Sequence, residues 1–443
     1  MSVGITPAIL AAAQGGGIDV AFAPLMTTLA LQKGSGSATF TRASSGTVPD
    51  ASWNWQSMAS NIHRLWGGTW SGSSWSATGV TSTSKLGVTW FNQNGFGLLL
   101  EPSRTNTILY GRALTTWGKA ADVTLTNNQT GIDGAANAAT LYSAGGTAGW
   151  STAYKISSQP SNTFSSSAFC KKDPAPGGFL CKSDGATGGV RMGYNPVDGS
   201  THLITNWTGV DYGSTQHGDW FRPFVVFTDS NAIYVMHVAL GNTPWNLTYT
   251  FTGPINVVTD ANQLEVGYAP TCPIYTTSAA VTRAAETLKW PATNNLNATS
   301  GVLIVDTELP FLKDTSLLSS GTMGLVSLTA SAASLCYYDF SAQAFKATDG
   351  TNTASVAAVP ARGKRYRIAV RWDTTANQLQ IGCKNITDSG PWSWGTVTAF
   401  AGSFAGSDGN ITLGVGIPES ILIPNMMILR KIQSTSTIQG IFT

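Results

Sequence analysis

The sequence predicts an all-β protein: two β-sandwiches preceded by an irregular N-terminal attachment region. Short segments rich in β-branched and aromatic residues recur at intervals of about 8–12 residues, with turn residues between them. No helical periodicity extends beyond the N-terminal segment. No repeat of blade length is present, so sandwiches are favoured over a propeller.

The surface is expected to be polar but nearly uncharged. Charged residues make up 11% of the 443 residues, against roughly 25% in ordinary soluble domains. Hydrophobic residues make up 42%, which is enough for a core and argues against disorder. The formal net charge of +2 gives no general attraction for nucleic acid. Such a surface suits a protein that is packed into a large assembly or exposed to harsh media.

Residues 1–93 are predicted to form the attachment region. A short helix is expected over residues 6–14, because Thr6 can cap it and Pro7 suits its first position. This helix cannot bury its apolar face alone, so it docks either on a partner or second copy, or on its own domain. Six tryptophans follow it, and packing is favoured over sugar stacking as their role. They are Trp53, Trp55, Trp66, Trp70, Trp75 and Trp90.

The rest of the chain is predicted to form the two sandwiches. The first spans residues 94–288, and its opening stretch, residues 94–117, is the expected hinge after the attachment region. A cluster of Pro and Asn residues marks a linker over residues 289–298. The second sandwich spans residues 299–443.

Residues 365–373 give the clearest strand pattern in the chain, because apolar and charged side chains alternate almost perfectly. One face carries Tyr366, Ile368, Val370 and Trp372, and the other carries Arg365, Arg367, Arg371 and Asp373.

Four short segments carry a resemblance to a known group of proteins. They are residues 39–44 (TFTRAS), 97–106 (GLLLEPSRTN), 263–276 and 280–284 (AVTRA), and the third contains Gln263-Leu264-Glu265, Gly267, Pro270-Thr271 and Thr276. In order and spacing they resemble tailed-bacteriophage virion proteins with concanavalin-like (laminin-G-like) jelly-roll domains. The resemblance covers about residues 39–288 and departs at Cys272-Pro273, where a small polar and an aromatic residue are expected. It implies jelly-roll sandwiches and a structural role in a virion.

Two glutamates in these segments suggest two opposite roles. A glycosidase needs two carboxylates across a cleft, and Glu101 and Glu265 are the acids that the motifs provide. Arg104 and Arg283 lie close to them in these segments and are expected to form ion pairs with them. A structural clamp is therefore favoured over a catalytic pair, and no catalytic residue is expected.

Carbohydrate binding is predicted for three residues of the second sandwich. Trp392 and Trp394 lie in a loop flanked by Gly and Pro and are the best candidates for sugar stacking; packing over the end of the sandwich is the alternative. Arg365 closes the basic cluster of residues 362–365, which suits a phosphate or an acidic sugar. A solvated strand entry is the alternative for this cluster.

No cofactor and no metal site are expected. None of the four histidines has the spacing of a metal motif, and His237 is most simply a strand residue. No nucleophile elbow and no phosphate loop are present in the sequence. Buried free thiols are the favoured state of the five cysteines, with a Cys170–Cys181 bridge as the alternative. The five are Cys170, Cys181, Cys272, Cys336 and Cys383.

The expected function is that of a non-enzymatic virion structural protein: a tail or head fibre, a spike or a capsid decoration. Its expected partners are other virion proteins through the N-terminal region, further copies of itself (a trimer by analogy) and a host-surface polysaccharide, but no nucleic acid and no membrane. No apolar run of about 18 residues and no convincing signal peptide are present, so assembly in the host cytoplasm is expected. The alternative is a carbohydrate-active enzyme, such as a glycan depolymerase or lyase, or a free carbohydrate-binding module.

Overall fold

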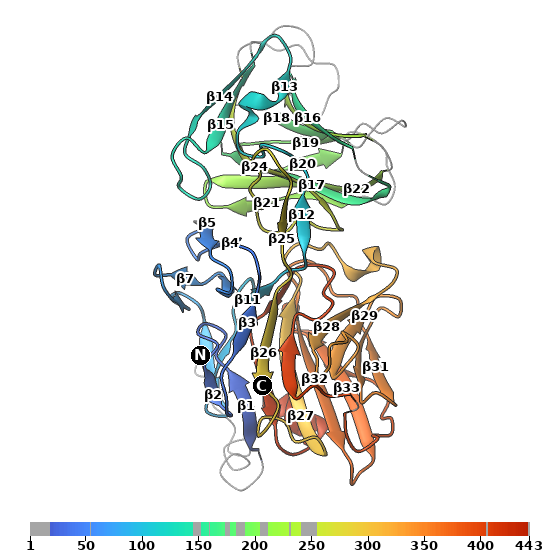
Figure 1. Cartoon of the computed structure of the whole chain (residues 1–443). Coiled ribbons are helices and arrows are strands. Elements are labelled where there is room, and N and C mark those ends of the chain that lie inside the picture. The colour runs from blue at the N-terminus through green and yellow to red at the C-terminus, as the bar shows by residue number, and fades with distance from the viewer. Residues whose placement is uncertain are drawn as a thin grey trace. The chain divides into compact units, whose positions relative to one another are not determined.

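The computed structural model describes most of the chain, and this part is nearly all β, as predicted (Figure 1). The predicted helix over residues 6–14 lies outside the described residues. The described residues are 18–53, 55–144, 152–158, 160–172, 178–182, 191–203, 211–229, 232–240, 255–404 and 406–441.

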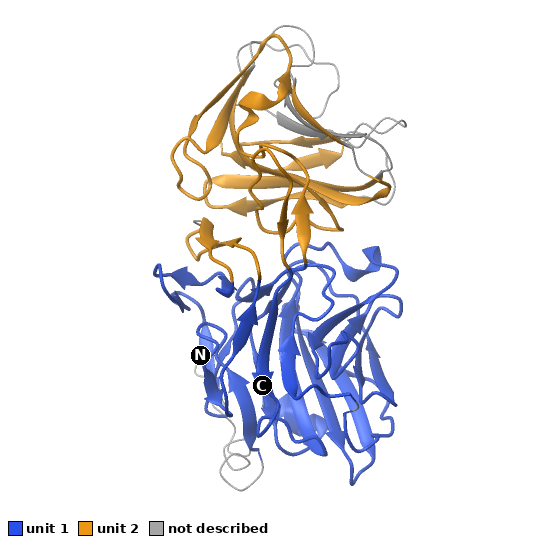
Figure 2. Ribbon diagram, viewed as in Figure 1, with its two compact units in different colours: residues 1–42, 61–102, 285–443 blue, residues 43–60, 103–284 orange. Residues whose placement is uncertain are grey.

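The chain folds into two compact units, and it passes between them four times (Figure 2). Unit 1 contains residues 1–42, 61–102 and 285–443, and unit 2 contains residues 43–60 and 103–284.

This division differs from the predicted boundaries. The region expected to be a separate attachment region, residues 1–93, is shared between the units, and most of its described part belongs to the same unit as the C-terminal half. The expected linker over residues 289–298 begins inside a strand, Thr287–Pro291. The physical reason is strand pairing between segments far apart in the sequence, which local composition does not reveal.

Unit 2 contains two six-stranded antiparallel sheets. In spatial order, the first consists of β13 (Gly118–Lys119), β16 (Thr152–Ser158), β23 (Ala232–Leu240), β18 (Gly178–Lys182), β19 (Arg191–Tyr194) and β20 (Thr201–Leu203). The second consists of β14 (Val123–Gln129), β15 (Ala139–Ala144), β24 (Ile255–Val266), β17 (Asn162–Lys171), β22 (Trp220–Asp229) and β21 (Asp211–His217). The shorter elements are β4 (Gly46–Pro49), β5 (Trp55–Met58), β12 (Arg104–Asn106), η1 (Leu114–Thr116) and β25 (Val281–Arg283).

The core of unit 2 lies between these sheets. One buried cluster joins Tyr142 of β15 and Phe221 of β22, from the second sheet, to Ala153 of β16 and Tyr194 of β19, from the first. Side chains from facing sheets that share one cluster define a sandwich. The predicted strands over residues 123–126, 221–227 and 233–240 all lie in this unit.

Unit 1 is organised around a ten-stranded sheet. Its main path is β2 (Leu31–Lys33), β1 (Val20–Pro24), β37 (Met426–Leu429), β27 (Ser300–Glu308), β32 (Arg365–Asp373), β33 (Gln378–Asn385) and β34 (Ser393–Trp394). Three strands join it beside this path: β6 (Arg64–Trp66), β11 (Gly97–Leu100) and β36 (Ile421–Ile423). The N-terminal β1 thus lies between β2 and the C-terminal β37, which explains why the N-terminal segment does not fold apart.

Smaller sheets and connecting elements complete unit 1. A three-stranded sheet contains β3 (Thr39–Thr41), β26 (Thr287–Pro291) and β35 (Asn410–Leu413). A four-stranded sheet contains β28 (Thr322–Val326), β29 (Cys336–Asp339), β30 (Ala344–Thr348) and β31 (Thr353–Ala357). The remaining elements are β7 (Thr69–Trp70), β8 (Trp75–Ser76), β9 (Ser82–Lys85), β10 (Val88–Phe91), η2 (Thr315–Leu317) and α2 (Thr435–Gly440).

Both faces of the large sheet are covered at its centre. Nearly every residue of β27 is buried, whichever way its side chain points. On one face, Ile304 of β27 and Ala369 of β32 share a cluster with Trp90 of β10 and Ile438 of α2. A strand buried on two faces has a continuous apolar run, which explains residues 302–305 of this strand.

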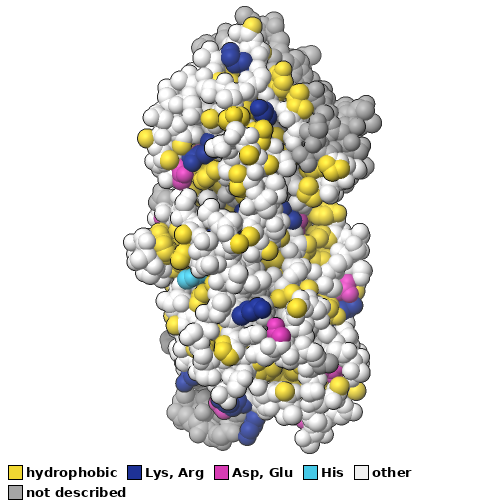
Figure 3. Space-filling model, viewed as in Figure 1, with side chains coloured by type: hydrophobic (Ala, Val, Ile, Leu, Met, Phe, Trp, Pro, Cys, Tyr) yellow, Lys and Arg dark blue, Asp and Glu magenta, His cyan; other side chains and the backbone are white. Residues whose placement is uncertain are grey.

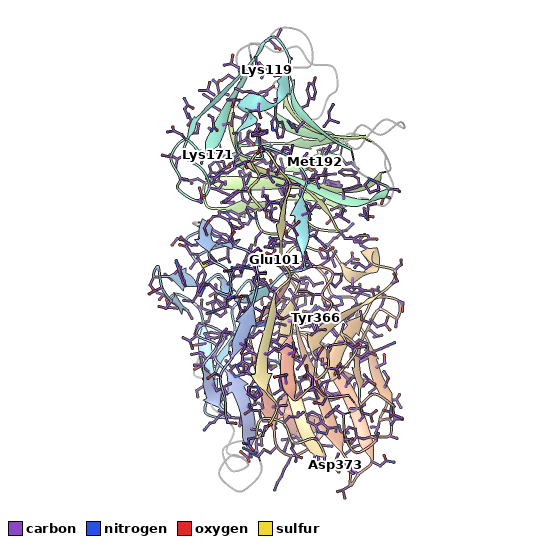
Figure 4. All side chains as sticks on the ribbon, in the orientation of Figure 1. Glu101, Lys119, Lys171, Met192, Tyr366 and Asp373 are labelled. Carbon is purple, nitrogen blue, oxygen red and sulfur yellow. The ribbon has the colours of Figure 1, made fainter. Side chains whose placement is uncertain are left out.

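The predicted strand over residues 365–373 is confirmed at both ends by β32, and Figure 4 labels Tyr366 and Asp373 near its two ends. The prediction that the tryptophans serve packing is confirmed for Trp55, Trp66, Trp75 and Trp90, which are all buried.

Candidate functional site

Unit 1 contains a buried cluster of two glutamates and two arginines. The first two motif segments contribute to this cluster, and the fourth ends two residues before it. Arg42 donates from Nη1 to Glu286 Oε1 over 2.6 Å. Arg64 donates from Nη2 to Glu286 Oε2 over 2.5 Å and to Glu101 Oε2 over 2.6 Å. All four side chains are fully buried. The four charges cancel within the cluster, as burial requires.

Backbone and hydroxyl donors complete this cluster. The Glu101 N–H donates to Glu286 Oε2 over 2.9 Å, and Ser420 Oγ donates to Glu101 Oε1 over 3.0 Å. Strand pairing positions the groups, because Leu99 of β11 lies opposite Arg64 of β6. Glu101 follows β11 directly and lies among closely packed side chains (Figure 4).

These contacts extend the predicted clamp. Glu101 is a structural ion-pair residue as expected, and Arg64 is a partner that the sequence did not suggest. Arg64 and Glu286 were missed, because the sequence gives no sign that β6 pairs with β11. Glu286 lies just after the fourth motif, and this proximity is the only signal that could have suggested it.

In unit 2, Glu265 is held by neutral donors. Thr271 donates to it twice, from its backbone N–H over 3.0 Å and from Oγ1 over 2.5 Å, and the side-chain amide of Gln263 donates as well. Glu265 is fully buried. Arg283, the predicted partner, instead donates from Nη1 to the carbonyl oxygen of Cys272 over 2.9 Å. Glu265 forms no ion pair with any residue in the described part of the chain.

Arg104, the fourth clamp residue, lies against the backbone of Gly267. A Cβ placed on Gly267 would lie 2.5 Å from Arg104 Nη2, and Gly267 has φ +155°. Glycine is favoured at this position of the third motif by the backbone conformation, and a larger residue would also displace the Arg104 guanidinium. In β12 and β25, Arg104 is the register partner of Arg283.

The buried state of these acids decides what they can do chemically. Glu101 and Glu265 have no exposed surface, and each already accepts several hydrogen bonds. A general acid or nucleophile must reach a substrate atom within hydrogen-bond distance. Neither carboxylate is available to a substrate in this conformation, so both act as structural groups.

Unit 2 contains a further ion network that sequence reasoning missed. Arg112 donates to Asp260 over 2.9 Å from Nε and to Asp133 over 2.7 Å from Nη2. Its guanidinium also lies over the ring of Tyr275. Burial by itself would lower the pKa of Arg112, but the two carboxylates together raise it.

Arg365, predicted to bind sugar, is fully buried in unit 1 and cannot contact a ligand in this conformation. It donates from Nη2 to Asp306 Oδ2 over 2.8 Å, and Arg367 donates from Nε to Asp306 Oδ1 over 2.8 Å. The prediction for Arg365 is wrong because the polar face of β32 is covered where β10 ends: Arg365 also donates to the carbonyl oxygens of Phe91 and Gln93. The alternative of a solvated strand entry is also wrong for this residue.

Asp306 accepts hydrogen bonds from both Arg365 and Arg367. Burial alone would raise its pKa, but Arg367 and Arg365 outweigh burial and lower it below the usual range. Asn425 Nδ2 adds a hydrogen bond over 2.9 Å.

Trp392 and Trp394 stack on each other at the edge of the large sheet, with ring centroids 5.4 Å apart and planes inclined by 19°. Both are half-buried and pack against the cluster that contains Trp90. Trp394 lies over Gly382 of β33, its register partner. The alternative of packing therefore holds for Trp394, while both indoles keep some exposed surface.

A pocket of about 270 Å³ opens on the same part of unit 1. Its lining is polar and cationic, and no acidic residue belongs to it. The lining residues are Asn92, Asn94, Arg367, Lys384, Ile386 and Ser389.

The described histidines and cysteines do not form a metal site. No group of three or more His, Cys, Asp or Glu side chains is placed to hold a metal ion in the described residues. In unit 2, His217 is buried among Trp53, Trp55 and Phe169, and burial lowers its pKa to about 3. The side chain of His237 lies outside the described residues.

Cys336 and Cys383 are buried free thiols, as predicted, and burial raises both pKa values, that of Cys383 to about 11. Cys170 and Cys272 are also buried. The side chain of Cys181 lies outside the described residues, so the Cys170–Cys181 pairing stays a prediction.

Comparisons with known proteins identify no family. No protein-family model and no curated protein matches the chain. Among solved structures, the chain is weakly similar to Trypanosoma rangeli sialidase in complex with sialic acid, with a TM-score of 0.24 and 9% sequence identity. The likeness covers 69% of this chain and 60% of that one, and at this level it supports no inference about function. In the described residues, no helix is long and apolar enough to cross a membrane.

Proposed function

We propose that the protein is a non-enzymatic virion structural protein of a tailed bacteriophage, a fibre, spike or decoration that displays β-sandwiches for adhesion to a host-surface glycan. The observation that carries this proposal is the position of the four motif segments. Arg42 of the first segment forms a buried ion pair with Glu286, which lies 244 positions away and just after the fourth segment. Because the motif residues are buried in structural contacts, the resemblance that they carry is a resemblance in fold.

The surface supports the same proposal. Figure 3 shows one face of the molecule on which uncharged side chains dominate and the few charged ones are scattered. A protein with 11% charged residues and a 42% hydrophobic content presents mainly Ser, Thr, Asn, Gln and Gly to its surroundings. Such a surface suits neutral hydrogen bonding with saccharides and packing against other coat proteins.

Particle association tests the virion part of the proposal. Phage particles purified from a lysate are sedimented through a density gradient, and the chain is followed by a specific antibody and by electron microscopy with a label. The proposal expects the chain to co-sediment with intact particles and the label to lie at a fixed position. A chain that stays at the top of the gradient in every preparation contradicts it.

Glycan cleavage tests the non-enzymatic part. The full chain is incubated with polysaccharide extracted from the host surface, and both retention and chain length are measured. The proposal expects retention without shortening. Shortened chains would support the alternative of a glycan depolymerase or lyase.

A further inference from the structure

In unit 1, the sheet register places a lysine opposite an arginine and close to two tryptophans in the sequence of the next strand. Arg367 of β32 lies opposite Lys384 of β33. In the pairing of β33 with β34, Gly382 lies opposite Trp394 and Cys383 opposite Ser393. Trp392 directly precedes Ser393, and Lys384 directly follows Cys383, so both lie next to the last pair of this register.

These three side chains share one face of the sheet. Side chains alternate along a strand, so Lys384 points to the same side as the Cβ that Gly382 lacks, and Trp394 covers that side. Trp392 is two residues from Trp394 and stacks on it, so it lies on this side too. Trp392 and Lys384 therefore lie on one face at the same edge of the sheet.

Lys384 is the available charge in this row. Arg367 is nearly buried and bound to Asp306 from two nitrogens. Lys384 is half-buried, and its ammonium forms no ion pair or hydrogen bond with any residue that the structure describes. A half-buried cation without a carboxylate partner is a ready site for an anion.

The pocket beside this row has the lining that an anionic group requires. Arg367 and Lys384 supply positive charge, and Asn92, Asn94 and Ser389 supply side chains that can donate hydrogen bonds. The nearby acids are already bound: Asp306 by two arginines, Asp388 by Lys364 over 2.5 Å, and Glu308 by the Gly95 N–H over 2.9 Å. The four cations Lys364, Arg365, Arg367 and Lys384 outnumber these three acids. The local charge therefore remains positive.

We propose that this pocket binds the carboxylate of an acidic saccharide, with the sugar ring lying against Trp392. The cation and the amides fix the carboxylate, while the apolar face of the ring packs on the indole, as rings do on aromatic side chains. The proposal rests on the proposed function only in taking the ligand to be a surface glycan. It replaces Arg365, which is buried, with Lys384 and Arg367 as the charged residues of the site.

Calorimetric titration of the full chain with oligogalacturonate tests this site. The proposal expects binding to the wild type, weakened about tenfold in Lys384→Gln, because one charge-assisted hydrogen bond is lost. Trp392→Ala should weaken binding to a similar degree. Affinity should also fall as the salt concentration rises, since the contact is electrostatic and partly exposed.

Lys313→Gln is the matched control. Lys313 is an exposed lysine of the same unit, does not line the pocket and carries the same charge. The proposal expects it to bind like the wild type. Equal affinity of Lys384→Gln and Lys313→Gln for oligogalacturonate overturns the proposal.

Two further ligands separate the possible sources of the signal. Maltohexaose, which is neutral, should bind at least tenfold more weakly than oligogalacturonate, and sodium sulfate should compete with oligogalacturonate in the wild type but not in Lys384→Gln. Equal binding of maltohexaose and oligogalacturonate would overturn the charged pocket while leaving glycan adhesion intact. Co-sedimentation with particles is scored independently, so failure of the pocket and failure of the virion proposal are distinguishable.

Discussion

The two units bury their motif acids in different ways. In unit 1, Glu101 and Glu286 are balanced by Arg42 and Arg64, so four full charges share one dry cluster. In unit 2, Glu265 accepts hydrogen bonds from a threonine and an amide. Two buried acids of one chain are thus stabilised differently, one by charge balance and the other by neutral donors. The two solutions respond differently to mutation.

The largest loss of stability is expected for Glu286→Gln. This change removes the acid that holds Arg42 and Arg64 together and leaves buried cations with too few acceptors, which costs about 3–5 kcal/mol. Hydrogen exchange resolved by peptide should show lost protection in β6, β11 and β26 of unit 1. The control is Asp19→Asn, which removes an exposed pair with Arg430 and should leave protection unchanged. Equal protection in the two variants would contradict the central role of the cluster.

A similar loss, about 3 kcal/mol, is expected for Asp306→Asn, because Arg365 and Arg367 then lose their common acceptor. Urea unfolding followed by tryptophan fluorescence measures it. Asp373→Asn is the matched control, because Asp373 ends β32, the strand that carries Arg365 and Arg367, and its carboxylate is partly exposed. A change no greater than that of the control would show that the arginines find other acceptors.

The pH dependence of stability tests the role of Asp306 separately. The pKa of Asp306 is lower in the folded state than in the unfolded chain. The stabilisation by Asp306 is therefore complete above the unfolded pKa of about 4 and is lost as pH falls from there through the folded value. Unfolding of the wild type at pH 6, 4 and 3 should show this loss, and Asp306→Asn should show a smaller slope. Parallel slopes would contradict the assignment.

A smaller loss of stability, about 1–2 kcal/mol, is expected for Glu265→Gln in unit 2. The amide keeps one acceptor for Thr271, and no arginine is left unpaired by the change. Urea unfolding of this variant and of Glu286→Gln compares the two units directly. A larger loss for Glu265→Gln than for Glu286→Gln would reverse the comparison.

The smallest effect is expected for Lys384→Gln, within about 0.5 kcal/mol of the wild type. Its ammonium has no partner in the described residues, so the fold does not depend on it. Thermal unfolding checks this expectation. A clear loss of stability would mean that Lys384 belongs to the fold.

Local pattern was sufficient for some predictions and insufficient for others. The alternation of polar and apolar side chains predicted both ends of β32 at residues 365 and 373, because this pattern depends only on residues within the strand. It did not show that Arg365 is buried, since the covering residues, Phe91 and Gln93, lie more than 270 positions away. Contacts between distant parts of the sequence also explain why Arg64 was not predicted as a partner of Glu101. They explain as well why the predicted domain boundaries differ from the two units.

The candidate site was half predictable for the same reason. Trp392 and Trp394 attracted attention because two indoles in a Gly- and Pro-flanked loop are unusual, and the structure shows them stacked and half-buried. Lys384 gave no signal in the sequence. Its role depends on strand pairing, which places it opposite Arg367 and at the same sheet edge as the two tryptophans.

The central claim is that the motif acids stabilise the fold, while the half-buried Trp392 and Lys384 and the pocket beside them bind a glycan. Its most direct test is the incubation of host-surface polysaccharide with the wild type, Glu101→Gln and Lys384→Gln, with bound polysaccharide and new reducing ends measured together. The account predicts retention by the wild type, weaker retention by Lys384→Gln, and no new reducing ends in any sample. Reducing ends that form with the wild type and disappear with a folded Glu101→Gln variant would contradict it.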